Sequence, residues 1–255
     1  GTLDGIEAAG EDDVWRYFQA TYRPDGAILS VAGKFPWPQL RDHVAQLFDG
    51  WAARPLPELD HTPVAERIRH LPQESSQTHI GISHPNVPYS HPDYYDARAA
   101  VGVLSDGMSS RLFTEVRENR GLCYAVQASC HSLRDRGSVL CYAGTTTERA
   151  QETLEVVMAE LRRLAEGIAQ DELDRLKAKL KSSLIMQQES SPARSNSIAA
   201  DWYHLGRVQT VDEVRAIIDG LSRDRINLYL ASHPPRDFRI VTVGEKPLEI
   251  PVGIS

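Results

Sequence analysis

Cysteine is scarce in this sequence, with only Cys123, Cys130 and Cys141 among 255 residues. That number is too small for a disulfide scaffold. All three lie in apolar segments typical of strands, where a free cysteine is normally buried. A turn near Asp135 and Arg136 would place Cys130 opposite Cys141, so a cross-strand disulfide is geometrically allowed without being implied.

Long apolar runs and an excess of positive charge are also missing. Because no stretch of about 18 apolar residues exists, the sequence predicts no transmembrane segment. Lys and Arg number 28 against 35 Asp and Glu, for a net charge of -7. This argues against a nucleic-acid or anionic-membrane partner, which a basic patch would recognise. The rest of the composition, 41% hydrophobic and 25% charged, is that of an ordinary globular protein.

Common catalytic motifs are absent too. The nine histidines form neither HExxH nor HxxEH, the spacings that place two imidazoles on one helical face beside a Glu. His79 and His84 lie five residues apart on a predicted strand, so we expect them to point to opposite faces. No GxSxG, Walker A or GxGxxG motif is present. The sequence therefore predicts no metal site in this chain and indicates no nucleophile or phosphate cradle.

What the sequence does contain is an alternation of helical and extended patterns. Periodicity and breakers predict helices over 11–23, 38–48, 91–104 and 109–119, and a mostly helical stretch from 150 to about 232. They predict strands over 27–33, 65–71, 77–84, 123–132, 138–145 and 238–243. A polar, proline-bearing stretch over 54–63 is typical of a linker.

An internal repeat is indicated at an offset of 211 residues. Residues 11–34 fall without gaps on residues 222–245, and both copies have the order helix, proline turn, buried strand, glycine. Residue 1 is Gly rather than Met, so we expect most of the first copy to lie upstream. The predicted organisation is residues 1–53 as the tail of a first half, 54–63 as a linker and 64–255 as a complete second half. A targeting segment would also lie upstream, which leaves the compartment open between cytoplasm and periplasm.

One segment, residues 107–124 (GMSSRLFTEVRENRGLCY), combines a capped helix, a glycine stop and a strand. This order would let Arg117 and Tyr124 converge at the corner between helix and strand. A guanidinium fork and a phenol hydroxyl suit the binding of a peptide carbonyl or an oxyanion. The same residues also fit a cationic helix end and a buried tyrosine ring, and local chemistry leaves both interpretations open.

The stretch GMSSRLFTEVRENRGLCYAV resembles the second-half motif of the zinc metallopeptidases related to pitrilysin, insulin-degrading enzyme and the mitochondrial processing peptidase. It is most similar to the bacterial processing-peptidase-like branch. TYRPDGAILSVAGKF, HIGISHPNVPYSHPDYY and LDRLKAKLKSSLI also match, so the resemblance covers about 11–245. It implies an α+β fold: a two-layer domain with a mostly antiparallel sheet packed against helices.

The resemblance also implies that two halves with different roles face each other across a chamber. The first half of such enzymes carries the inverted HxxEH zinc motif, and the second supplies an Arg and a Tyr seven residues apart. Here that spacing gives Arg117, implied to bind the substrate backbone, and Tyr124, implied to hold the scissile peptide or its oxyanion. Because this chain has no HxxEH, zinc is expected in the missing first half or in a partner. The chain alone is expected to be inert.

Two functions follow as alternatives. The first is the substrate-binding half of a zinc-dependent endopeptidase, with a peptide substrate and the metal-bearing half as partners. The second is a zinc-less partner subunit or scaffold that binds peptides or an active subunit. Upstream residues would separate the two, because they either contain HxxEH or do not. The sequence gives no support to a third possibility, a self-contained enzyme with another site. It also does not identify the substrate.

Overall fold

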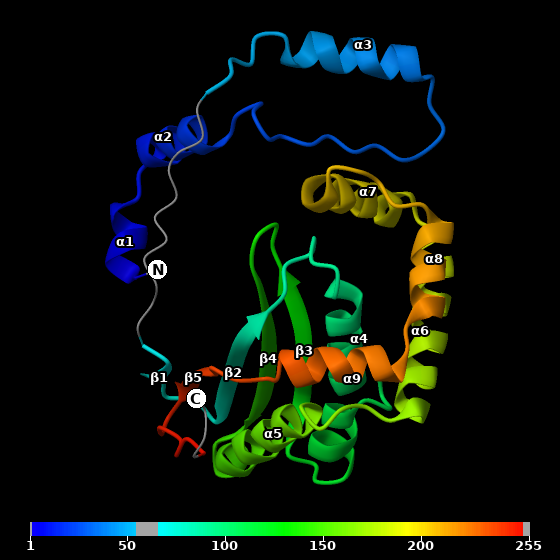
Figure 1. Cartoon of the computed structure of the whole chain (residues 1–255). Coiled ribbons are helices and arrows are strands. Elements are labelled where there is room, and N and C mark those ends of the chain that lie inside the picture. The colour runs from blue at the N-terminus through cyan, green and yellow to red at the C-terminus, as the bar shows by residue number, and fades with distance from the viewer. Residues whose placement is uncertain (1, 55–65, 252–255) are drawn as a thin grey trace.

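The computed structural model describes residues 2–54 and 66–251, and its second part contains a five-stranded sheet packed against helices (Figure 1). The strands are β1 (Ile68–Pro72), β2 (Gln77–Asn86), β3 (Cys123–Ser132), β4 (Gly137–Thr146) and β5 (Arg239–Gly244). The helices before β3 are α1 (Leu3–Ala8), α2 (Glu11–Thr21), α3 (Trp37–Phe48), α4 (Tyr94–Ser105) and the π-helix η1 (Phe113–Glu118). Those after β4 are the 3₁₀ turn η2 (Thr147–Arg149), α5 (Ala150–Leu164), α6 (Gln170–Gln188), α7 (Ser191–Leu205), α8 (Val211–Gly220) and α9 (Arg223–Ser232).

The strands lie in the order β1-β5-β2-β4-β3. β1 pairs with β5 in parallel, whereas β5 with β2, β2 with β4 and β4 with β3 pair antiparallel. The prediction of an α+β fold with a mostly antiparallel sheet is confirmed. The last strand of the chain is inserted between the first two, an arrangement that local patterns do not reveal.

One face of the sheet is buried and the other is open. Along β2 the side chains alternate between buried and more exposed positions, and the buried set includes Ile80, Ile82 and His84. α4 packs against β3, and α5 packs against β2 and β4. Aliphatic side chains of α5 and α9 complete this core, among them the fully buried Leu154 and Ile226. Burial of each such side chain contributes about 1.5–3 kcal/mol.

Local signals predicted most helix boundaries. The capping box at the start of α8 is present: Thr210 Oγ1 accepts from the Glu213 N–H at 3.2 Å, and Glu213 Oε2 accepts from the Thr210 N–H at 2.6 Å. The segment predicted as a helix over 109–119 forms a π-helix, η1, over its central part. His79 and His84 do lie on opposite faces of β2, as their spacing predicts.

The strand predicted over 27–33 is wrong, because these residues form no strand in the structure. The segment that the predicted repeat aligns with it, β5, has strands on both sides. A strand needs such neighbours to satisfy its backbone groups, and the described residues supply none beside 27–33. α1, α2 and α3 bury no side chain and lie apart from the sheet (Figure 1). The predicted linker, 54–63, falls almost entirely outside the described residues.

The cysteine register differs from the one that would allow a disulfide. Cys130 pairs with Val139, and Cys141 pairs with Ala128. The reason is a turn closed by the Leu133 N–H donating to the carbonyl oxygen of Arg136 at 2.7 Å, which centres the hairpin one residue earlier than expected. All three cysteines are free. Among the described helices, none has the length and apolar character needed to cross a membrane.

A buried histidine makes the stability of this domain sensitive to acid. Burial lowers the pKa of His84 from 6.5 to about 4, while a 2.9 Å hydrogen bond between Nδ1 and the carbonyl of Pro85 opposes that shift. Below pH 6.5 the unfolded chain binds a proton that the folded chain does not bind until about pH 4. The loss of stability due to His84 is therefore absent above pH 6.5 and reaches roughly 3 kcal/mol as the pH approaches 4.

Urea unfolding at several pH values, for the wild type and His84→Leu, measures this loss. The variant should lack this component of the pH dependence, whereas His131→Leu, at an exposed position of β3, should retain it. Identical pH profiles for the wild type and His84→Leu would contradict the assignment.

Candidate functional site

The candidate site begins with a π-helical turn. η1 lies between α4 and β3 along the chain, and its own residue Val116 is fully buried. The N–H of Leu122 donates to the carbonyl of Val116 at 2.9 Å, and the N–H of Gly121 donates to that of Arg117 at 3.1 Å. Gly121 has φ +59°, a left-handed conformation that favours glycine. The turn therefore ends abruptly and delivers the chain into β3, as its sequence predicts. Single π-turns of this kind occur frequently at functional sites.

A β-bulge places Tyr124 outside the core. Cys123 pairs with Thr145 and Ala125 pairs with Gly144, so Tyr124 is an extra residue opposite a continuous β4. Its side chain is 87% exposed, whereas Cys123 before it is buried. Bulges re-aim side chains in this way. The alternation of apolar and polar residues along the sequence does not reveal where a bulge lies.

The structure brings Arg117 and Tyr124 together. The Cζ of Arg117 lies 5.6 Å from the centroid of the Tyr124 ring and 4.8 Å from that of Phe113. Such cation–π contacts hold a guanidinium without consuming its N–H donors. Arg117 is exposed and forms no ion pair with a carboxylate of the described residues. The positive charge of Arg117 is thus held against the Tyr124 ring, with N–H donors left for a ligand.

The residues near Arg117 and Tyr124 differ in burial and in the partners that they contact. Burial raises the pKa of the Cys123 thiol, and the positive charge of Arg117 acts in the opposite direction. Arg120 lies 3.9 Å from a Glu152 carboxylate oxygen in an exposed ion pair. The sequence groups Arg111 with these arginines, but its side chain is only 8% exposed and forms a bidentate pair with Glu172.

The Arg111–Glu172 pair anchors the segment that leads into η1. Arg111 Nε donates to Glu172 Oε1 at 2.7 Å, and Nη2 donates to Oε2 at 2.8 Å and to the carbonyl of Gly167 at 2.9 Å. Glu172 Oε2 also accepts from the Ala169 N–H at 2.8 Å, which caps α6. Because the partners are 61 residues apart, no local pattern identifies this pair.

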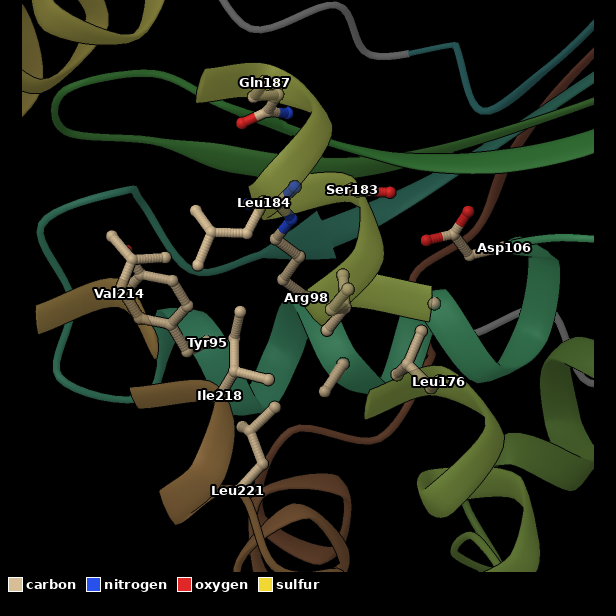
Figure 2. A pocket seen from close by; sticks show the side chains of 13 residues that line it. Tyr95, Arg98, Asp106, Leu176, Ser183, Leu184, Gln187, Val214, Ile218 and Leu221 are labelled. Carbon is tan, nitrogen blue, oxygen red and sulfur yellow. The ribbon is translucent and has the colours of Figure 1, made fainter. Parts of the chain in front are cut away.

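The structure also has pockets among its helices, apart from the site at Arg117 and Tyr124. A pocket of about 90 Å³ between α4, α6 and α8 is lined largely by aliphatic side chains such as Leu184 and Ile218 (Figure 2), and it is small for a ligand site. A larger hollow of about 710 Å³ lies beside the start of α4 and contains Arg225, which pairs with Asp96 at 2.7 Å. Within the described ranges no group of three His, Cys, Asp or Glu residues is arranged to hold a metal.

Comparisons with known proteins agree on one family. The model of the peptidase M16 inactive domain matches residues 9–180. An uncharacterized zinc protease of Bacillus subtilis is 30% identical over 236 residues, which cover 89% of this chain and 56% of that protein. One from Streptomyces coelicolor is 29% identical over 240 residues, covering 89% and 51%. The chain therefore spans about half the length of the curated relatives that it matches.

Solved structures show the same fold. A peptidase M16 inactive domain from Pseudomonas fluorescens superposes with a TM-score of 0.78 at 20% identity, covering 98% of this chain and 61% of that one. A protease from Helicobacter pylori superposes with a TM-score of 0.80 at 19% identity, covering 96% and 61%. At these identities the likeness concerns the fold alone.

Proposed function

The chain belongs to the peptidase M16 family as an inactive domain, and from this premise we propose that it is the substrate-binding half of a zinc-dependent endopeptidase. The resemblance carried by residues 107–126 is thereby confirmed at the level of the family. The proposed substrate is a peptide, cleaved in a chamber between this half and a metal-bearing half.

The observation that carries the proposal is the exposed pair of Arg117 and Tyr124 at the junction of η1 and β3. The Cζ of Arg117 lies 5.6 Å from the Tyr124 ring centroid, and neither side chain is committed to the core. In the proposed role, Arg117 donates N–H hydrogen bonds to carbonyls of the peptide backbone. Tyr124 donates its hydroxyl to the scissile carbonyl, whose oxygen gains negative charge during attack.

Zinc fits the family but not the residues of this chain. The relatives are described as zinc proteases, yet the sequence has no HxxEH and the described residues offer no cluster that could hold the ion. We therefore assign no zinc-dependent step to this chain and place zinc in the metal-bearing half. Zinc bound there would supply an activated water and a Lewis acid. The work of this chain is to bind and orient the peptide.

The exposed apolar surface of the N-terminal segment supports an association with another half. Trp15 and Phe18 of α2, and Trp37 of α3, are exposed. Exposed apolar patches of this kind mark surfaces that another protein or domain covers. The proportion of each relative that the chain spans, about half, agrees with a partner of similar size.

Zinc content and peptide cleavage should be measured on this chain alone and after mixing with a separately expressed metal-bearing half. The expected result is no zinc and no cleavage alone, and zinc-dependent cleavage after mixing. A metal-bearing half whose HxxEH glutamate is replaced by Gln is the matched control. Peptide binding without any gain in cleavage on mixing would favour a zinc-less partner subunit. Zinc and cleavage in the isolated chain would overturn the proposal.

A further inference from the structure

The open face of the sheet carries a second polar pair close to Tyr124. Nδ1 of His79, on β2, lies 2.8 Å from the hydroxyl oxygen of Tyr142, on β4. The two rings are stacked, with centroids 6.0 Å apart and an interplanar angle of 21°. Tyr142 is exposed and His79 is half-buried, and both alternate with the buried side chains of their strands. Local sequence patterns did not identify this pair, because its members are 63 residues apart.

Two glycines shape the surface around the pair. A Cβ at Gly144 would lie 2.8 Å from the Tyr142 hydroxyl oxygen, so only glycine leaves room for the phenol to reach His79. A Cβ at Gly81 would meet nothing closer than the backbone oxygen of Val241 at 3.7 Å, which leaves the sheet bare beside the pair. Glycine within a strand often marks a site where another backbone approaches closely.

The strand register fixes the distance between this pair and the proposed substrate-binding residue Tyr124. His79 pairs with Gly144, and Gly144 pairs with Ala125, the residue after Tyr124. Two steps between strands of about 5 Å each place the Cα of His79 roughly 10 Å from that of Ala125. An extended peptide covers this distance in about three residues. One bound peptide can therefore contact Tyr124 and His79 together.

Hydrogen-bond chemistry determines what His79 offers to a ligand. We assign the phenol hydroxyl as the donor and Nδ1 as the acceptor, and this tautomer carries its proton on Nε2. Among the residues that the structure describes, the hydrogen bond of the His79 side chain is made through Nδ1, and Nε2 makes none. The pair thus presents one oriented N–H donor on the open face.

We propose that His79, oriented by Tyr142, donates a hydrogen bond from Nε2 to a backbone carbonyl of the peptide, about three residues from the scissile bond. This inference rests on the proposed function, because it assigns a further contact to the same substrate. His79 is a substrate-binding residue in this scheme, and Tyr142 is a positioning residue that acts through it.

The test uses the enzyme assembled from both halves and an unstructured fluorescent peptide. His79→Gln retains a donor at the place of Nε2, whereas His79→Asn places its amide nearer to Nδ1. His79→Asn and Tyr142→Phe should raise KM about 3- to 10-fold with kcat within about twofold, the effect of one neutral hydrogen bond. His79→Gln should stay close to the wild type. His131→Asn, at the far end of the same face, is the matched control.

Equilibrium binding of the same peptide, followed by fluorescence anisotropy, should weaken in parallel with KM. Equal impairment of His79→Gln and His79→Asn would overturn the inference, since the Nε2 donor would not be the cause. Unchanged KM in every His79 variant, with turnover still lost in Arg117→Ala, would overturn it while leaving the proposed function intact. A wild-type enzyme that neither binds nor cleaves the peptide would overturn both.

Discussion

Peptide turnover should fall by about 10- to 1000-fold when Tyr124 is replaced by Phe or Arg117 by Ala in the enzyme assembled from both halves. Phe keeps the ring that stacks with the guanidinium of Arg117 but removes the hydroxyl that would stabilise the charged oxygen. Ala at 117 removes a fork of donors that holds the peptide in place. The Tyr124 hydroxyl acts most strongly as charge develops in the transition state, so its loss should fall mainly on kcat. Arg117 contacts the bound peptide before the reaction as well, so its loss should also raise KM.

Two measurements separate this role from a structural one. Zinc content should not change in either variant, because the metal is assigned to the other half. Arg120→Ala is the matched control: it lies in the same segment but pairs with Glu152, and its turnover should stay near that of the wild type. If both Tyr124→Phe and Arg117→Ala turn over peptide at the wild-type rate, the assignment of this site is wrong.

The largest loss of stability is expected from Arg111→Ala, at about 3–5 kcal/mol. The substitution leaves Glu172 partly buried without its bidentate partner, and it leaves the carbonyl of Gly167 without the donor at 2.9 Å. Burial alone would raise the pKa of Glu172, but the hydrogen bonds from Arg111 and the Ala169 N–H outweigh it and lower that pKa. The contribution of the pair is therefore full above the ordinary carboxyl pKa and is lost as the pH falls through the depressed value.

Chemical denaturation of the purified chain measures this effect. Arg175→Ala is the matched control, because its pair with Asp171 on the same helix is exposed and should be worth under about 1 kcal/mol. Replacing Arg111 and Glu172 together by Met should restore much of the stability, since no buried charge is left alone. A loss below about 1 kcal/mol in Arg111→Ala would refute the anchoring role.

The predicted elements that are present in the structure are those whose signals lie within a few residues of each other. The helices from α4 onward and the β3–β4 hairpin follow from apolar periodicity, caps and glycine stops, which act within a few residues. The strand expected over 27–33 fails because a strand exists only beside another strand, and its own residues cannot supply one. The hairpin turns one residue earlier than the turn that would place Cys130 opposite Cys141, and this difference is enough to separate the two cysteines.

The sequence by itself determined the family, the absence of an HxxEH zinc motif from this chain, and the spacing that places Arg117 one short turn and one glycine stop before Tyr124. Those features depend on residue identity and on neighbours along the chain. Only the tertiary structure decided that a bulge exposes Tyr124, that Arg111 pairs with Glu172 and that His79 meets Tyr142. Each of these depends on which distant segments become neighbours, a choice made by the packing of the whole core rather than by any local pattern.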